Sequence, residues 1–229
     1  MNLVISEFEE KVEEINEYFS FIEKTTHLRL DISEEMIYVT QTVFNTLKSS
    51  LFLLLYNLIE ASFRKSLEKI CYQIKQDNLK YKEVIPAIKK IWIEKKYKNF
   101  ENIKIPQNMQ KSEYIMKKID SIAEDTVKIT SKNELSGNVT PSVIKESVNK
   151  YGLVAQDISE EDYNHPLCTI KDRRNWLAHG NQSFNECSRD TTIIELKIIK
   201  NESIEYMRFI LSHIKTFIED KQYKLDEEV

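Results

Sequence analysis

The sequence predicts an all-α fold, and its composition and its apolar spacing both favour that class. The chain of 229 residues contains only 3 Gly and 4 Pro, which leaves little material for the many tight turns of a β fold. Hydrophobic residues make up 41% of the chain, enough for a sizeable core. Several long stretches repeat apolar residues every three or four positions, as one face of a helix does. Because no stretch resembles a linker, we expect one domain, residues 1–229, built as a helical bundle with long central helices.

Two helices are expected before a long central one. Apolar residues recur at helical spacing from Ile5 onward, and Ser6 with Glu9 is expected to form a capping box at the start of this helix. Ser33 is expected to cap a second helix with two glutamates in its first turn, although the threonines that follow weaken the helix propensity. From about residue 44 to residue 76 the apolar pattern strengthens, which predicts the central helix.

The central helix carries a polar stripe, Asn57, Glu60 and Arg64, beside its apolar one. A carboxylate among leucines and isoleucines is costly to bury unless it is paired, so Glu60 needs a partner. One candidate is Arg64, four residues further on the same helix. The alternative is a polar group on a neighbouring helix.

A basic stretch follows, at residues 82–97, and is expected to form a helix that tolerates Pro86 near its start. Its lysines alternate with aromatic residues, a mixture that can hold phosphates and stack on bases. The plainer interpretation is a solvated basic face with the aromatic residues in the core. The candidate RNA-binding residues here are Lys89, Lys90, Lys95 and Lys96, interleaved with Trp92 and Tyr97.

The middle of the chain is expected to be mainly helical. A helix is predicted over residues 112–125, and the alternation in residues 126–130 indicates a short strand. Residues 136–138 form a turn, after which Thr140 caps a helix that Pro141 opens.

The stretch of residues 170–180 holds the most distinctive pattern, Arg174-x4-His179 with Asn175 between them and Gly180 directly after. Apolar spacing and the glycine predict one helix that presents polar groups at its C-terminal end. Positions five apart on a helix are separated by about 140°, so Arg174 and His179 cannot meet within one helix, whereas Asn175 and His179 share a face. A site that uses both needs a cleft, most simply one against a second copy of the same helix.

The same spacing recurs as Arg208-x4-His213, and Arg173 also reaches His179 with a spacer one residue longer. The second copy lies in the middle of a final amphipathic helix, which Asp190 is expected to cap. There a core or boundary histidine is favoured over a catalytic one. Spacing alone is therefore weakly specific, and the context of the first copy distinguishes it.

Three stretches together resemble the HEPN superfamily, whose ribonucleases carry an Arg-x4-6-His motif with a polar residue after the arginine. They are residues 54–60 (Leu-Leu-Tyr-Asn-Leu-Ile-Glu), residues 135–138 (Leu-Ser-Gly-Asn), and the motif at residues 174–180 followed by Ser183 and Phe184. In this order they are similar to stand-alone bacterial HEPN proteins sometimes called the MAE type. The likeness covers nearly the whole chain.

The resemblance implies a metal-independent endoribonuclease that works as a homodimer and leaves a 2′,3′-cyclic phosphate. In that interpretation His179 transfers protons and Arg174 holds phosphate. Asn175 makes a positioning contact through its side-chain amide. Glu60 and Asn57 orient the motif from the neighbouring helix. Arg173 is a further candidate for RNA contact. The resemblance also implies a toxin or an anti-phage defence effector, often kept silent by an antitoxin or regulatory partner protein.

The residue types suit this chemistry. Cleavage without metal needs one group to take the 2′-hydroxyl proton, another to protonate the leaving oxygen, and cations to hold the phosphorane. Histidine changes charge near neutrality, and arginine offers a permanent planar fork for phosphate oxygens. One chain offers one well-framed histidine, so a twofold dimer is expected to supply two.

Two other interpretations remain open. One is an inactive HEPN module that binds RNA, a nucleotide or a partner protein as a dimeric scaffold. The other is a purely structural helical adaptor, in which Arg174 pairs with an acid, Asn175 caps and His179 binds the last carbonyls of the helix.

The remaining composition narrows the class of protein. The net charge of -4 gives no overall attraction to nucleic acid, so any RNA contact needs a local basic patch. Three scattered cysteines indicate reduced thiols, and four histidines without ligand spacing predict neither a metal nor another cofactor. No signal pattern opens the chain, and the apolar run at residues 51–56 is far shorter than a membrane span. We expect a cytoplasmic protein that does not enter a membrane.

Overall fold

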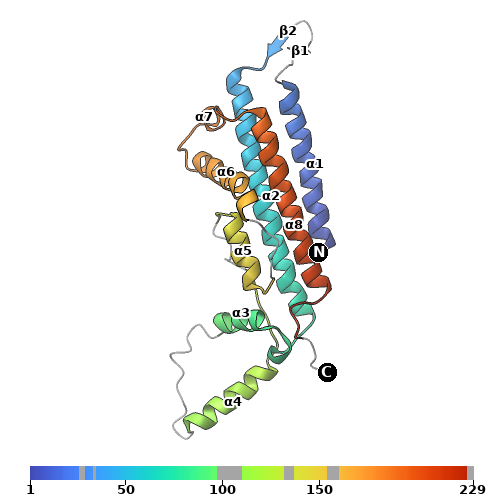
Figure 1. Ribbon diagram of the computed structural model, residues 1–229, viewed down its shortest axis with the longest axis vertical. Helices are drawn as coiled ribbons and strands as arrows, with labels where there is room; N and C mark the ends of the chain where they lie inside the picture. The colour runs from blue at the N-terminus through green and yellow to red at the C-terminus, as the bar shows by residue number, and fades with distance from the viewer. Residues whose placement is uncertain (26–28, 33–34, 97–109, 132–136, 154–159, 226–229) are drawn as a thin grey trace.

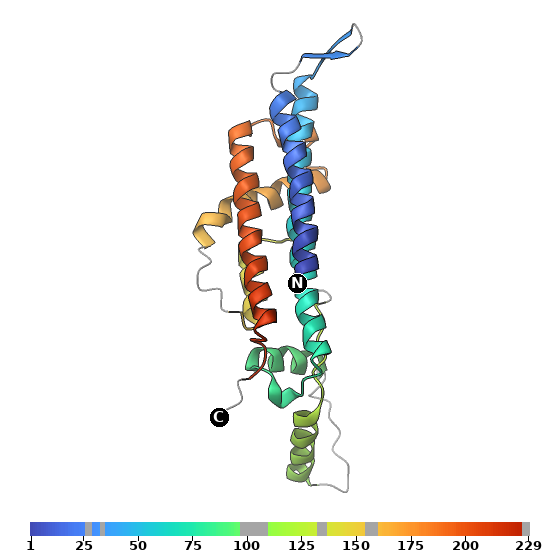
Figure 2. The ribbon, with the colours of Figure 1, turned by 90° about the vertical axis from the view of Figure 1, so that its right-hand side faces the viewer.

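The computed structural model describes residues 1–25, 29–32, 35–96, 110–131, 137–153 and 160–225. Three long helices run side by side along an elongated molecule: α1 (Asn2–Thr25), α2 (Gln41–Gln76) and α8 (Ile193–Glu219) (Figure 1). Helix α6 (Glu160–Ala178) lies across them near mid-height (Figure 2). The predicted all-α class is confirmed.

One hydrophobic core joins the long helices, and α1 shows how the sequence builds it. Its buried residues follow the predicted spacing of three and four: Phe8, Val12, Ile15, Phe19 and Ile22. The predicted capping box is wrong, because α1 begins at Asn2 and Ser6 lies inside it, where its hydroxyl donates to Glu10 at 3.2 Å. The core spacing was therefore a better guide than the cap signal.

A two-stranded hairpin replaces the second predicted helix. Strands β1 (Arg29–Ile32) and β2 (Glu35–Tyr38) pair antiparallel, and Ser33 lies outside the described residues. The long helix α2 then begins after Thr40, whose hydroxyl accepts the Val43 N–H at 3.3 Å. Thr40, one of the threonines that weaken helix propensity, thus lies at the boundary, where a hydroxyl cap stabilises the helix.

The basic stretch begins its helix later than predicted. A short 3-10 turn, η1 (Tyr81–Glu83), precedes α3 (Pro86–Lys96). Proline disfavours helical backbone in the residue before it and fits the first helical position, so Pro86 opens α3. Helix α3 lies across the foot of the bundle, and α4 (Lys111–Glu124) extends beyond it (Figure 1).

The strand predicted at residues 126–130 is wrong. The segment makes only an isolated bridge between Thr126 and Lys80, in which the Val127 N–H donates to the Leu79 carbonyl at 2.8 Å. The alternation was real, since Val127 and Ile129 are both buried. The partner segment is too short to make a ladder.

The last part of the chain contains α5 (Pro141–Lys150), α6, the short α7 (Phe184–Cys187) and α8. Thr140 caps α5 as predicted. Helix α6 contains Pro166 and continues past it. Asp190 does not cap the final helix. Thr192 does so in a capping box: its hydroxyl accepts the Glu195 N–H at 3.2 Å, and the Glu195 carboxylate accepts the Thr192 N–H at 2.7 Å.

Candidate active site

The motif helix α6 ends in a Schellman motif, which fixes the backbone around His179. Gly180 has a φ of +69°, the left-handed conformation that glycine adopts without strain. The Asn181 N–H donates to the Trp176 carbonyl at 2.8 Å, and the Gly180 N–H donates to the Leu177 carbonyl at 3.3 Å. His179 therefore stands directly after Ala178, the last residue of the helix, so the predicted presentation of polar groups at this helix end is confirmed.

Arg174 is held by two contacts in the middle of the molecule. Its guanidinium lies over the ring of Tyr56, with 4.4 Å between the guanidinium carbon and the ring centroid. Its Nη1 donates to the Asn175 Oδ1 at 2.8 Å. Within the described residues Arg174 forms no ion pair with an acid, so one face of its plane rests on an aromatic ring and its charge is not cancelled by an adjacent carboxylate.

Tyr56 and Asn138 complete this arrangement, and the sequence analysis did not include them among the site residues. The Tyr56 hydroxyl donates to the Gly137 carbonyl and accepts the Val139 N–H at 3.4 Å. The Asn175 Nδ2 donates to the Asn138 Oδ1 at 3.1 Å. The three stretches that carried the resemblance thus meet in space: α2 through Tyr56, the turn before α5 through Asn138, and α6 through its Arg-Asn pair.

The Tyr56 hydroxyl is protonated at neutral pH, and burial favours that form further. The side chain is 1% exposed, and its burial raises the pKa of Tyr56 above the ordinary value of 10.0. The nearby Glu60 carboxylate raises the pKa of Tyr56 further. At neutral pH the hydroxyl therefore remains a hydrogen-bond donor to the turn at Gly137.

Glu60 and Asn57 lie beside this network on α2. Glu60 pairs with Arg64, the partner four residues away on its own helix. Asn57 is exposed. Within the described residues neither side chain makes a hydrogen bond or ion pair with Arg174 or His179, and Glu60 acts on Tyr56, the ring over which Arg174 lies.

His179 is exposed at the end of α6. Its ring makes no hydrogen bond to any part of the chain that the structure describes, and its backbone N–H donates to the Asn175 carbonyl at 3.0 Å. Arg174 and His179 do not meet within one chain. The site thus combines a fixed cation with an accessible imidazole one helical turn further along.

Arg173 is turned away from this site and holds the segment that follows α6. It donates to the Cys187 carbonyl, and its Nη2 lies 3.2 Å from the Asp190 Oδ1. Only 14% of its side chain is exposed. Burial acts to raise the pKa of Asp190, but the hydrogen bond from Arg173, a backbone hydrogen bond and the charges of Arg173 and Lys48 together lower that pKa overall. Arg173 is thus committed to a structural ion pair.

Lys48 of α2 also holds the segment that follows α6. Its ammonium group is buried and donates to the Ser188 carbonyl at 2.8 Å and to the Thr191 carbonyl at 2.7 Å. Burial lowers the pKa of Lys48. A lysine inside an apolar helical stretch was the signal in the sequence, and together with Arg173 it fixes the segment between His179 and α8.

The second Arg-x4-His pair is tied into the bundle. Arg208 makes two hydrogen bonds to Glu9 of α1, at 2.8 and 2.6 Å. The His213 Nδ1 lies 2.9 Å from the Phe209 carbonyl, and the two rings pack with centroids 4.1 Å apart and planes tilted by 45°. This is the boundary environment that the sequence predicted for His213.

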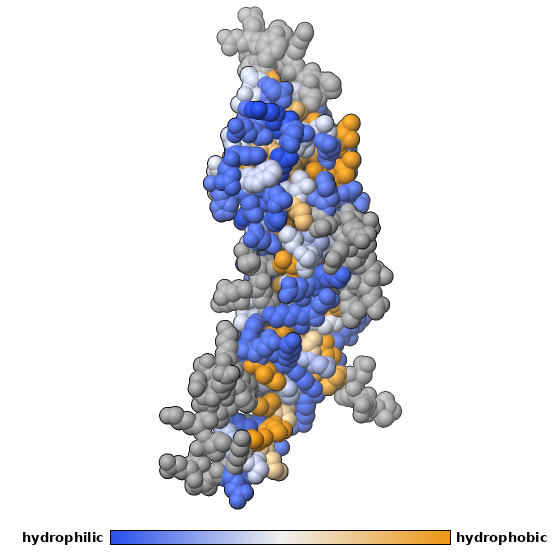
Figure 3. Space-filling view, turned by 60° about the vertical axis from the view of Figure 1, so that its left-hand side comes forward, coloured by the Kyte–Doolittle hydropathy of each residue, from blue (hydrophilic) through white to orange (hydrophobic). Residues whose placement is uncertain are grey.

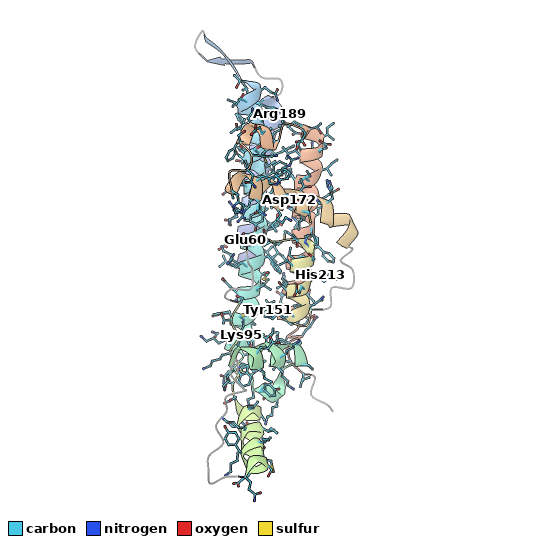
Figure 4. The ribbon with its side chains drawn as sticks, turned by 90° about the vertical axis from the view of Figure 1, so that its left-hand side faces the viewer. Glu60, Lys95, Tyr151, Asp172, Arg189 and His213 are labelled. Atoms are coloured by element: carbon cyan, nitrogen blue, oxygen red, sulfur yellow. The ribbon has the colours of Figure 1, made fainter. Side chains whose placement is uncertain are left out.

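The basic residues of α3 lie at the foot of the molecule, well below the motif. Figure 4 labels Lys95 below Glu60 along the long axis. Lys89 lies over the ring of Tyr81 at 5.4 Å, and Lys90 is exposed. Lys96 pairs with Asp125. The structure therefore brings Arg174, Asn175 and Asn138 together but leaves the α3 lysines apart from them.

No metal centre is formed by the parts of the chain that the structure describes, where no three His, Cys, Asp or Glu side chains gather around a common point. Helix α2 is long and apolar enough to span a membrane by length and composition alone. Half of its most apolar window is buried inside the bundle, as in a core helix.

The helical bundle and the Arg-x4-His site together define a protein of the HEPN class, and a family comparison agrees. The family model described as HEPN_MAE_28990-like HEPN matches residues 2–223. The chain therefore belongs to this HEPN family, and the predicted resemblance is confirmed. No curated protein and no solved structure gives a significant match to the chain.

Proposed function

We propose that the protein is a metal-independent endoribonuclease that acts as a homodimer with a composite active site. The observation that carries the proposal is the contrast between two motif residues. Arg174 is fixed over Tyr56 at 4.4 Å, whereas His179 is exposed at the adjacent helix end. A preorganised cation suits a phosphate whose charge grows in the transition state, and an accessible imidazole suits proton transfer.

The roles follow from this geometry. Arg174 holds the scissile phosphate, and its position depends on the Tyr56 ring beneath it. Asn175 links Arg174 to Asn138, so its amide orients the guanidinium. His179 moves protons to or from the sugar and the leaving oxygen. Glu60 supports the site through Tyr56.

A second copy of the chain supplies the second histidine that acid–base cleavage needs. Exposed apolar side chains beside the motif support a self-association surface there. Leu54 of α2, one turn before Asn57, is 40% exposed, and Phe184, which follows the motif in α7, is 38% exposed. The surface on the α6 and α7 side is otherwise largely hydrophilic (Figure 3). We propose that this face pairs with its twofold copy.

In the cell, the proposed role is that of a toxin or anti-phage defence effector acting on RNA in the cytoplasm. An antitoxin or regulatory partner protein would restrain such an activity. Support comes from the family and from the accessible His179, which leaves the proposed catalytic edge open to a partner or to RNA.

A matched pair of histidine variants tests the proposal. Purified wild type, His179→Ala and His213→Ala are incubated with total cellular RNA. We expect cleavage by wild type and by His213→Ala, and none by His179→Ala, with all three proteins folded. Binding of RNA without cleavage by wild type would favour the inactive dimeric scaffold instead.

A further inference from the structure

We infer that the indole of Trp176 stacks on a base of the RNA substrate and so positions the nucleotide whose sugar lies at His179. The inference rests on the proposed function, because it names a substrate-binding residue of the same site. Trp176 belongs to the motif helix α6 and comes three residues before His179. Its place on the helix, its limited packing and the arginine beneath it support the assignment.

Helical spacing places Trp176 on the same side of α6 as His179. The side of α6 that faces the bundle includes Leu167 and Ile170, which are 1% and 0% exposed. Positions nine apart on a helix differ by about two and a half turns, so Trp176 lies opposite Leu167 and His179 lies opposite Ile170. Positions three apart are neighbours on a helix surface. The indole and the imidazole are therefore adjacent on the outer side of the motif helix.

The hydrophobic core does not use this tryptophan. Among the described residues, Trp176 is neither a member of the core nor one of the partly buried residues packed against it, and its side chain is half-buried. The other tryptophan, Trp92, is a core residue and is only 3% exposed. An indole offers a large apolar surface with a π face, and the core leaves that of Trp176 available to a ligand.

Arg173 holds the indole from its inner side. The guanidinium carbon of Arg173 lies 5.0 Å from the centroid of the Trp176 ring. That guanidinium is held in turn by the Cys187 carbonyl and by Asp190, and only 14% of the arginine side chain is exposed. Because the buried arginine covers one face of the indole, the accessible surface belongs to the other face.

This arrangement prepares the ring for stacking. A planar guanidinium stacks on an aromatic face and restricts the ring. The Trp176 backbone is fixed as well, because its carbonyl accepts the Asn181 N–H at 2.8 Å in the turn that ends α6. A ring that is already ordered loses less entropy when a base stacks on it. Arg173, expected from the sequence to contact RNA, thus acts on RNA through the indole that it supports.

The position of the ring indicates which part of the RNA it meets. Trp176 is two residues after Arg174, so it lies about 160° from that arginine around the helix and does not share its phosphate. Every base has a π face that stacks on an aromatic ring with little regard to sequence. The indole therefore binds a base beside the histidine, and the contact discriminates single-stranded from paired RNA more than one base from another.

The fluorescence of the full-length chain offers a direct readout. The chain contains two tryptophans, and Trp92 is buried. The parent protein carries His179→Ala so that RNA stays intact, and it is titrated with a short single-stranded RNA of mixed sequence. Binding is measured separately by the anisotropy of a labelled RNA. Trp176→Phe keeps a ring for stacking but removes the fluorescent reporter, and Trp176→Leu removes the ring.

Tyr72→Leu is the matched control. The Tyr72 side chain is 52% exposed and its ring also lies near a cation, the Lys69 ammonium at 4.6 Å. Tyr72 lies sixteen residues beyond Tyr56 on α2, about 24 Å along the helix from the contact with the motif. Circular dichroism melts verify the folding of every variant, and sedimentation velocity gives its oligomeric state.

We expect RNA to quench the fluorescence of the parent and not that of Trp176→Phe, although both bind RNA. Trp176→Leu should bind about tenfold more weakly, as expected for the loss of one stacked base. Tyr72→Leu should bind as the parent does. A series of RNAs, each lacking one base, should contain a position at which the parent loses affinity by the same factor. Trp176→Leu should lose little more there, because both changes remove one contact.

Several results would overturn the inference. They are unquenched fluorescence in the parent, no RNA binding by the parent, unchanged binding by Trp176→Leu, an equal loss in Tyr72→Leu, and losses from Trp176→Leu and the missing base that add in full. A Trp176→Leu protein that is monomeric where the parent is dimeric would assign the indole to the interface between copies instead. The quenching and the missing-base series use the parent, so they decide the matter even if Trp176→Leu fails to fold.

Cleavage assays on the same variants with His179 intact separate the two proposals. Quenching and weakened binding combined with no cleavage by wild type refute the nuclease and leave the stacking contact. Cleavage by wild type with an unchanged KM in Trp176→Leu refutes the stacking contact alone.

Discussion

The guanidinium of Arg174 lies 4.4 Å above the ring of Tyr56, and this contact joins the motif helix to the central helix of the bundle. Tyr56 in turn donates its hydroxyl hydrogen to the Gly137 carbonyl, next to the residue that accepts from Asn175. Arg174 is therefore positioned by the Tyr56 ring, by the Asn175 amide and, through that amide, by the turn at Asn138. Each of these supports can be removed separately.

Removal of the Tyr56 ring should disturb the arginine far more than removal of the hydroxyl. Tyr56→Phe keeps the surface under Arg174 and loses about 1 kcal/mol of stability with the hydrogen bond to Gly137. Tyr56→Ala removes a buried aromatic side chain and should cost about 3–5 kcal/mol. Urea denaturation measures both. An equal loss of stability in the two variants would contradict the packing role of the ring.

Loss of the Asn138 side chain should slow cleavage without unfolding the protein. Asn138 is exposed and its contact to Asn175 orients Arg174, so Asn138→Ala should lower kcat roughly tenfold while KM for RNA changes little. Asn149→Ala, at an exposed position on α5, is the matched control and should cleave as wild type does. A rise in KM alone would indicate that Asn138 binds RNA directly.

The Arg173 to Asp190 pair should make a pH-dependent contribution to stability. The pKa of Asp190 is lowered in the folded state from an ordinary value of 3.8. Its contribution is therefore fully present above about pH 4 and is lost as the pH falls through the lowered folded pKa. Since 73% of the Asp190 side chain is exposed, Asp190→Asn should cost less than about 1 kcal/mol at pH 7.

Thermal unfolding of wild type and Asp190→Asn between pH 7 and pH 2.5 measures that contribution. The difference in stability should shrink toward the acid end. A difference that stays constant across the range would show that Asp190 acts through something other than its charge.

A carboxylate placed beside the motif should break the proposed dimer. Leu54→Glu puts a charge into a surface that we expect to be buried between two copies, and burial of an unpaired charge is costly. Leu3→Glu, at a position 72% exposed near the start of α1, is the control. Analytical ultracentrifugation should show a monomer only for Leu54→Glu, with cleavage lost in parallel. A dimeric and active Leu54→Glu would place the interface elsewhere.

Helices were predictable because the core spacing repeats over many residues. In α1 and α2 a single misjudged position does not change the apolar stripe, so the elements were found correctly. The start of a helix, in contrast, depends on one or two residues, and neighbouring residues can compete for the N-cap position. Asp190 and Thr192 can both cap a helix, and the reciprocal bond from Glu195 favours Thr192, while Asp190 is used by Arg173. That ion pair is a tertiary contact and leaves no local pattern.

The candidate site was predictable in its residues but not in its contacts. The order of three stretches led to Arg174, Asn175 and His179, yet Tyr56 read as an ordinary member of an apolar stripe. Its role depends on which residue of α6 crosses above it, and helical spacing contains no such information. Arg173 and Arg174 are neighbours of the same type, and only the crossing geometry sends one to Asp190 and the other to Tyr56.

The most direct test of the account is the chemistry of the RNA ends produced in excess EDTA. A defined, end-labelled RNA is incubated with wild type and with His179→Ala, and the termini are identified by their sensitivity to phosphatase before and after acid treatment. The account predicts 2′,3′-cyclic phosphate ends with wild type and no products with His179→Ala. Products ending in a 3′-hydroxyl, cleavage abolished by EDTA, or unchanged cleavage by His179→Ala would contradict it.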